Sequence, residues 1–178
     1  IPIGFNRDVA WTATNTGADV MDFYREVVDD SASPTQYKVD GEWRETKALI
    51  IASGASPRYL GIDREKELIG HGLTSCATCD GAFYRNVPVC VVGGGDTACE
   101  EALFLTRFAS KVYLIHRRRA LRASKIMADR MLANPKIQPI WDTVITEYLT
   151  DASGEVRGVK LKNTISGSNG ELDVKCVF

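Results

Sequence analysis

Two cysteines at a spacing of three positions stand in the stretch Cys76-Ala77-Thr78-Cys79-Asp80. Thiols at this spacing close a small disulfide or open to a dithiol, and a loop-to-helix entry lowers the pKa of at least one of them. Asp80 follows directly and could relay a proton to the leaving thiolate if burial raises its pKa. The alternative role for Asp80 is a helix N-cap. The stretch predicts a redox-active pair with an acid beside it.

The remaining cysteines do not extend this pair into another kind of site. Five cysteines at irregular spacing make a poor framework for a secreted disulfide-bonded protein, and a single CxxC favours redox chemistry in a reducing compartment, which we expect to be the cytoplasm. A zinc site would need two further ligands at motif spacing, and His71 and His116 do not form such a pair. We expect the other three thiols to be inert core residues. They are Cys90, Cys99 and Cys176.

A glycine-rich run follows the redox pair. Gly93-Gly94-Gly95-Asp96-Thr97-Ala98 fits the pattern G-x-G-x-x-A between a predicted strand and a predicted helix. Gly93 permits the tight turn, Gly95 lets the backbone approach a pyrophosphate, and Ala98 allows close packing of helix on strand. The pyrophosphate would lie on the helix N-terminus, where free N–H groups favour negative charge. The strand–turn–helix context favours a dinucleotide site over a purely structural turn.

Cations occupy the place where an NAD site usually has an acid. The next predicted strand ends in His116-Arg117-Arg118-Arg119, and Arg122 follows one turn later. A carboxylate at this position, roughly twenty residues after the glycines, binds the ribose hydroxyls of NAD. Guanidinium groups instead bind a 2′-phosphate through charge-assisted hydrogen bonds. We therefore predict NADP(H) rather than NAD(H), the alternative being a solvated basic run.

Predicted strands and helices alternate through most of the chain. Polar and apolar residues alternate on both sides of Asp40-Gly41, which predicts a hairpin of residues 36–39 and 42–46. Residues 18–30 fit a helix or a strand. The second half has the βαβ rhythm of a dinucleotide-binding fold, so we expect an α/β protein with a Rossmann-like domain built as a three-layer sandwich. Expected strands cover 48–52, 88–92, 111–115, 137–140, 144–149, 156–161 and 172–178, and expected helices cover 98–108 and 124–132.

Composition and charge restrict the possible partners. The net charge of −1 provides no field that would attract nucleic acid or an anionic membrane. No apolar run approaches the ~18–20 residues that a membrane span needs. We therefore expect neither nucleic acid nor a membrane as a partner.

Three runs together closely resemble low-molecular-weight NADPH-dependent thioredoxin reductases. They are residues 75–84, 91–102 and 116–123, in that family's order and spacing, and residues 48–62 are also similar to its passage between domains. The resemblance implies that NADPH reduces FAD, FAD reduces a Cys76–Cys79 disulfide, and the dithiol reduces thioredoxin, with Asp80 as the acid. It places the pyrophosphate on Gly94, Gly95, Asp96 and Thr97, and the 2′-phosphate on Arg117, Arg118 and Arg122 in the motif that includes His116.

The resemblance also implies a domain division. Residues 1–59 would be a remnant of the FAD-binding domain and residues 60–178 the NADPH-binding domain. Members of the family open with a glycine-rich FAD motif and close with a Gly-Asp segment, which are not found here, so most of the FAD site would be missing and the chain would be an internal fragment. The full-length parent would be a homodimer. Alternatives are a non-catalytic NADP(H)-binding module, the reductase part of a reductase–thioredoxin fusion, and a related flavin reductase that serves a peroxiredoxin system.

Overall fold

The chain divides into two compact units, residues 1–55 and 56–178. The computed structural model describes residues 3–5, 10–12, 27–30, 35–45 and 57–178. The assignment of the two parts to an FAD and an NADPH domain stays a prediction.

Short antiparallel strands make up the described part of the first unit. β1 (Ile3–Phe5) pairs with β2 (Ala10–Thr12), and β3 (Val27–Val28), β4 (Gln36–Val39) and β5 (Glu42–Glu45) form a second sheet. The predicted hairpin is confirmed: Asp40 (φ 52°) and Gly41 (φ 85°) both have the left-handed backbone that a two-residue hairpin turn requires. The strand at 27–28 settles part of the ambiguous region, whereas residues 18–26 and the strand predicted at 48–52 lie outside the described residues.

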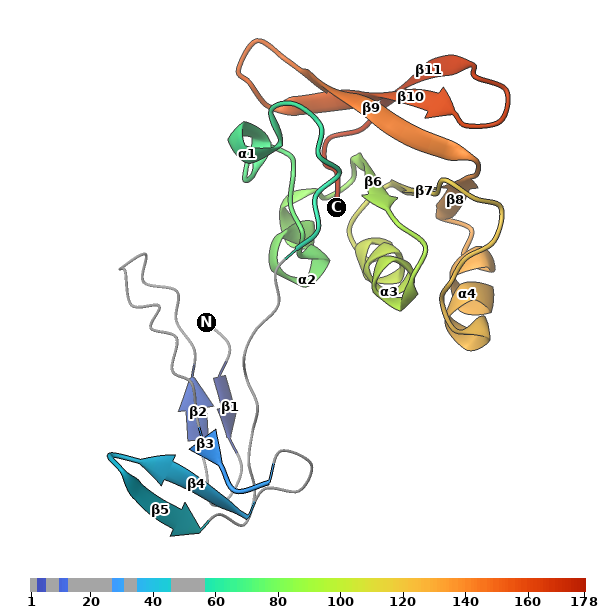
Figure 1. Ribbon diagram of the computed structural model, residues 1–178. Coiled ribbons are helices and arrows are strands. Elements are labelled where there is room, and N and C mark those ends of the chain that lie inside the picture. The colour runs from blue at the N-terminus through green and yellow to red at the C-terminus, as the bar shows by residue number, and fades with distance from the viewer. Residues whose placement is uncertain (1–2, 6–9, 13–26, 31–34, 46–56) are drawn as a thin grey trace. The chain divides into compact units, whose positions relative to one another are not determined.

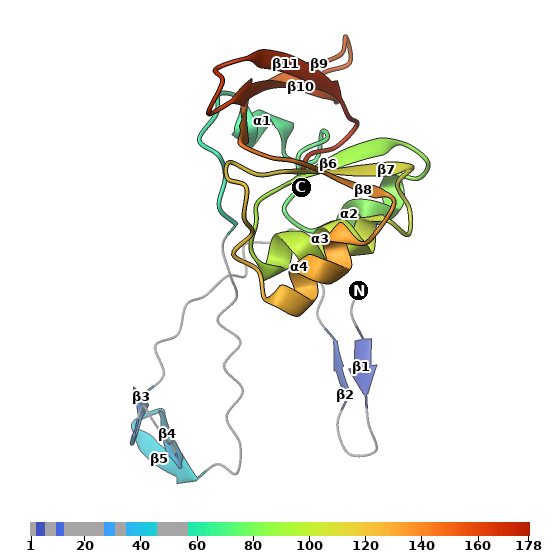
Figure 2. The same cartoon turned by 90° about the vertical axis from the view of Figure 1, so that its right-hand side faces the viewer.

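A parallel sheet lies at the centre of the second unit. β6 (Pro88–Val92), β7 (Lys111–Ile115) and β8 (Ile137–Ile140) pair side by side in chain order. The crossover helices α3 (Asp96–Leu105) and α4 (Lys125–Leu132) cover the same face of this sheet (Figures 1 and 2). The predicted βαβ order is confirmed, because each apolar strand is followed by a helix that buries one of its faces.

An antiparallel sheet covers the opposite face (Figures 1 and 2). It consists of β9 (Thr143–Thr150), β10 (Val156–Asn163) and β11 (Asn169–Asp173). Alternation along β6 builds both cores: Val89 and Val91 pack with the helices, while Cys90 packs toward the antiparallel sheet. The unit is therefore a three-layer sandwich, as expected.

The strand predicted at 172–178 is wrong in both bounds. β11 ends at Asp173, and the chain then leaves that sheet to lie along the free edge of β6. Cys90 N–H donates to the Cys176 carbonyl at 2.9 Å, and Phe178 N–H donates to the Cys90 carbonyl at 2.9 Å. Burying the apolar residues 176–178 beside β6 stabilises the fold more than continuing β11 would. Cys176 is therefore buried, as expected, but it lies outside the last strand.

The passage before the redox pair is anchored by one carboxylate. It contains α1 (Glu65–Leu68), and Glu65 is only 8% exposed. Its oxygens accept hydrogen bonds from Leu60 N–H and Gly61 N–H at 2.8 Å each, and from the Tyr148 hydroxyl on β9 at 2.9 Å. Because a buried carboxylate needs such donors, Glu65 fixes this segment to the antiparallel sheet.

The redox pair itself lies on two short helices. α2 (Ala77–Asp80) is followed directly by the 3-10 helix η1 (Gly81–Phe83). Among the described residues no helix is long and apolar enough to cross a membrane.

Candidate redox and nucleotide site

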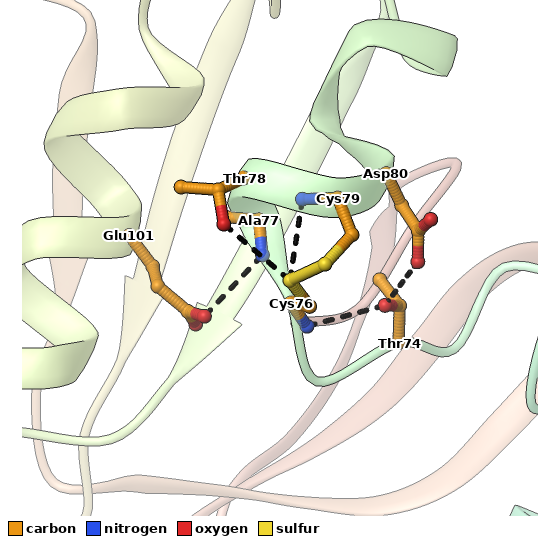
Figure 3. The surroundings of a disulfide bond; sticks show 7 residues. All are labelled: Thr74, Cys76, Ala77, Thr78, Cys79, Asp80 and Glu101. Carbon is orange, nitrogen blue, oxygen red and sulfur yellow. Dashed lines mark hydrogen bonds between the residues drawn. A yellow bond between two sulfur atoms is a disulfide. The ribbon is translucent and has the colours of Figure 1, made fainter. Parts of the chain in front are cut away.

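Cys76 and Cys79 form a disulfide at the start of α2, with their Cα atoms 5.3 Å apart (Figure 3). Cys76 is the N-cap residue, and its Sγ accepts a hydrogen bond from Cys79 N–H at 3.2 Å. The Thr78 hydroxyl lies 3.4 Å from the same sulfur. Donors directed at a sulfur stabilise the thiolate that forms when the disulfide opens. Cys79 is exposed to solvent, so the pair can meet an external reaction partner.

Asp80 holds the N-cap position of η1, but its side chain makes no capping hydrogen bond, so the capping alternative is confirmed for its position alone. Its carboxylate accepts a hydrogen bond from the Thr74 hydroxyl at 2.5 Å, and Thr74 Oγ1 accepts Cys76 N–H at 3.2 Å. This chain of contacts holds the entry to the redox helix in place. The role of Asp80 as a proton donor stays a prediction.

Sequence reasoning did not identify Glu101 as part of this site. Figure 3 shows its carboxylate reaching from α3 toward the backbone of α2, on the other side of the disulfide from Asp80. Ala77 N–H donates to Glu101 Oε1 at 3.3 Å, and burial raises the pKa of this carboxyl. A contact between residues 24 positions apart leaves no local pattern, so no sequence motif points to Glu101.

The glycine turn has a different steric requirement at each position. Gly93 adopts φ 150°, and a Cβ there would lie 2.9 Å from the Ala98 Cβ. A Cβ on Gly94 would lie 2.6 Å from Nδ1 and 2.8 Å from Nε2 of the His116 ring. A Cβ on Gly95 would meet nothing within 4 Å. The open space expected beside Gly95 is therefore present, whereas the crowding at Gly94 was not foreseen.

Asp96 and the carbonyl of Gly94 anchor the loop that follows β7. The Asp96 carboxylate accepts hydrogen bonds from the backbone N–H and the hydroxyl of Ser124 at 2.9 and 2.8 Å, and these bonds lower its pKa. Arg122 N–H donates to the Gly94 carbonyl at 2.6 Å. The glycine turn and the basic loop are thus one structural unit, although the sequence separates them.

A cavity of 440 Å³ lies between this turn and the basic loop. Gly93, Gly94 and His116 line it together with Arg117, Arg118 and Arg122, and no aspartate or glutamate of the described residues does. His116 is 7% exposed, its Nε2 lies 3.1 Å from the Ala120 carbonyl, and its ring packs edge-on against Trp141. The buried His116 ring is therefore a fixed part of the cavity wall.

The basic run divides into two roles. Arg119 does not line the cavity, because its Nε pairs at 2.5 Å with the buried carboxylate of Asp142. Arg117, Arg118 and Arg122 are exposed cavity residues. Binding of a 2′-phosphate by these three arginines stays a prediction.

A second cavity, of 210 Å³, connects the glycine turn with the redox segment. Thr97 and Glu101 of α3 line it, as do Thr74 and Ser75, the two residues before Cys76. It shares Arg58, Tyr59, Leu60 and Val92 with the larger cavity, so the two adjoin. The structure thus brings the disulfide and the predicted nucleotide residues into one compact unit.

The chain is similar in sequence to a known protein family. The chain matches the family described as pyridine nucleotide-disulphide oxidoreductase over residues 4–178. The chain belongs to that family. A thioredoxin reductase of Rickettsia typhi is 43% identical over 168 residues, covering 93% of this chain and 54% of the relative. A Pseudomonas fluorescens protein named glucosaminate ammonia-lyase is 49% identical over 154 residues, covering 85% of this chain and 48% of the relative.

Solved oxidoreductases of the family share the fold. The crystal structure of Lactococcus lactis thioredoxin reductase in its FR conformation has a TM-score of 0.69 and 41% identity, and the match covers 80% of this chain and 47% of that one. The chain spans about half the length of the relatives it matches.

Proposed function

We propose that this chain is the NADPH-binding, disulfide-carrying part of a thioredoxin-disulfide reductase. One observation carries the proposal: the Cys76–Cys79 disulfide shares a compact unit with an arginine-lined cavity that adjoins a glycine turn. Relatives and solved neighbours named thioredoxin reductase agree with it.

The residues of the unit fit NADPH. The open space beside Gly95 admits a pyrophosphate at the start of α3, a helix of ten residues. Arg117, Arg118 and Arg122 supply cations for the 2′-phosphate in a cavity that no carboxylate in the described part of the chain lines. Each charge-assisted contact contributes about 1.5–3 kcal/mol, which is enough to discriminate NADPH from NADH.

The disulfide accepts the electrons. The hydride of NADPH carries two electrons and one hydrogen, and one further proton comes from solvent or an acid. Together they convert the disulfide to two thiols and leave NADP⁺. Hydrogen bonds to the Cys76 sulfur stabilise the thiolate. Asp80, which Thr74 holds beside the redox helix, would supply a proton. The dithiol then reduces the disulfide of thioredoxin by thiol exchange.

FAD would carry electrons from NADPH to the disulfide when bound. The described residues of the first unit form small antiparallel sheets without a glycine turn at a helix N-terminus, so they do not form a flavin cradle.

An exposed apolar residue favours a protein as the acceptor. Phe83, the last residue of η1, is 81% exposed and follows the exposed Cys79 by four positions. Exposed aromatic side chains next to a reactive group are typical of protein contact surfaces. A non-catalytic NADP(H)-binding module or an ammonia-lyase would require neither this surface nor the disulfide.

The test uses the protein extended to the full length of its relatives. We expect Cys79→Ser to abolish NADPH-dependent reduction of thioredoxin while reduction of bound flavin by NADPH continues, because only the thiol exchange loses a partner. Stopped-flow absorbance of the flavin and an insulin-coupled thioredoxin assay measure the two steps. Thioredoxin turnover that survives the substitution refutes the proposed route.

A further inference from the structure

A fourth arginine lies on the cavity wall, from a different part of the chain. Arg58 comes from the segment before α1, whereas Arg117, Arg118 and Arg122 come from the loop after β7. Within the described residues, no hydrogen bond or ion pair engages the side chains of these arginines. Arg64, by contrast, pairs with Glu67. Among the described residues no carboxylate lines the larger cavity, whereas Glu65 and Glu101 line the smaller one. Unpaired guanidinium groups on the wall of the larger cavity favour a polyanionic ligand.

The segment that carries Arg58 is fixed in place. The buried Glu65 carboxylate accepts the N–H groups of Leu60 and Gly61, two and three positions after Arg58, and the Tyr148 hydroxyl. Gly61 has φ 77°, which lets the backbone turn toward that carboxylate. Arg58 is therefore presented from an anchored segment, which lowers the entropy lost on binding.

The position of Arg58 differs from that of the other arginines. Arg58 lines both cavities, whereas Arg117, Arg118 and Arg122 line only the larger one. A dinucleotide with its 2′-phosphate at the basic loop that extends toward the redox segment would have its pyrophosphate near the residues that the two cavities share. Arg58 therefore faces the centre of such a ligand and not its 2′-phosphate end.

The N-terminus of α3 has only a partial positive charge, and a carboxylate lies on it. Asp96, the first residue of α3, has an ionised carboxylate held by Ser124, and it opposes the partial positive charge of the helix N-terminus. A diphosphate bound here needs a compensating cation. Among the residues that the structure describes, no lysine lines either cavity, and Arg58 is the one arginine that both cavities share.

We propose that Arg58 binds the pyrophosphate of the nicotinamide dinucleotide, and so sets affinity without selecting between NADPH and NADH. This rests on the proposed function, because it takes the same nucleotide in the same cavities. Arg117 and Arg118 then select NADPH through its 2′-phosphate.

Calorimetric titration of the 178-residue chain with NADPH and with NADH separates these roles. We expect Arg58→Ala to weaken both nucleotides by the same factor, roughly tenfold or more, since one charge-assisted contact is lost. Arg58→Lys retains the charge and should recover part of the affinity. Arg117→Ala with Arg118→Ala should weaken NADPH alone. The matched control is Arg130→Ala, on α4 and outside both cavities, which removes the same charge and should change neither affinity.

Each outcome has one meaning. Loss confined to NADPH in Arg58→Ala, or no loss at all while Arg117→Ala with Arg118→Ala still weakens NADPH, overturns the role of Arg58 and leaves the proposed function standing. Failure of the unsubstituted chain to bind either nucleotide overturns the proposed function itself, and the role of Arg58 with it.

Discussion

Replacement of Gly94 by alanine tests how the glycine turn and the basic loop fit together. The added Cβ would lie 2.6 Å from Nδ1 of His116, a distance that real Cβ contacts essentially never show. The ring cannot move freely, because it is 7% exposed, bonded to the Ala120 carbonyl and packed against Trp141. The backbone of Gly94 does not have a positive φ, so the cost arises from this clash alone.

The size of the effect follows from two opposing contributions. Overpacking a well-filled site costs about 1–3 kcal/mol. Alanine in place of glycine restricts the unfolded chain and returns about 0.4–1 kcal/mol where the backbone is compatible. We therefore expect Gly94→Ala to lower the free energy of unfolding of the second unit by about 1–2 kcal/mol.

Urea titration followed by circular dichroism at the helical band measures this change, since the described α-helices all lie in the second unit. Gly95→Ala is the matched control: its Cβ meets nothing within 4 Å, so only the helix N-cap preference changes, by under about 1 kcal/mol. A double-mutant cycle adds the decisive arm. With His116→Ala present the clash has no partner, and Gly94→Ala should become neutral or slightly stabilising.

The result that would refute this reasoning is an equal loss from Gly94→Ala with and without the His116 ring. Such additivity would mean that the two positions do not touch. Equal destabilisation by Gly94→Ala and Gly95→Ala would likewise show that the turn resists any side chain, rather than one placed against His116.

Two further predictions concern the redox end of the unit. Burial raises the pKa of Glu101 above its ordinary value of 4.5, so its contribution to stability is present below that value and is lost as the pH rises through the higher folded pKa. Glu101→Gln should therefore gain stability relative to the unsubstituted chain as the pH rises, measured by urea titration across that range; a constant difference would contradict it. After mild reduction of the native chain, iodoacetamide should modify Cys76 and Cys79 alone, because the other thiols are fully buried and burial raises their pKa, to about 12 for Cys176. Peptide mass spectrometry reports the sites, and labelling of Cys90 would count against the packing.

Local patterns carried most of the fold prediction. The strands at 88–92 and 111–115 are continuous apolar runs, and the hairpin at Asp40-Gly41 has the residues that a left-handed turn requires, so each could be identified within a few residues. The last strand could not. Its apolar residues are buried as expected, but against the edge of β6, and a sequence does not say which sheet captures an apolar segment.

The candidate site divides in the same way. The sequence by itself determined the disulfide pair, the glycine turn and the cationic loop, because spacing and residue type express their chemistry over a few positions. Only the tertiary structure decided that Arg119 serves Asp142 while its neighbours line a cavity, and that Gly94 must leave room for His116. It also decided that Glu65 anchors the segment carrying Arg58 and that Glu101 holds the redox helix. The physical reason is that these contacts join segments far apart in the chain, so they exist only once the layers have packed.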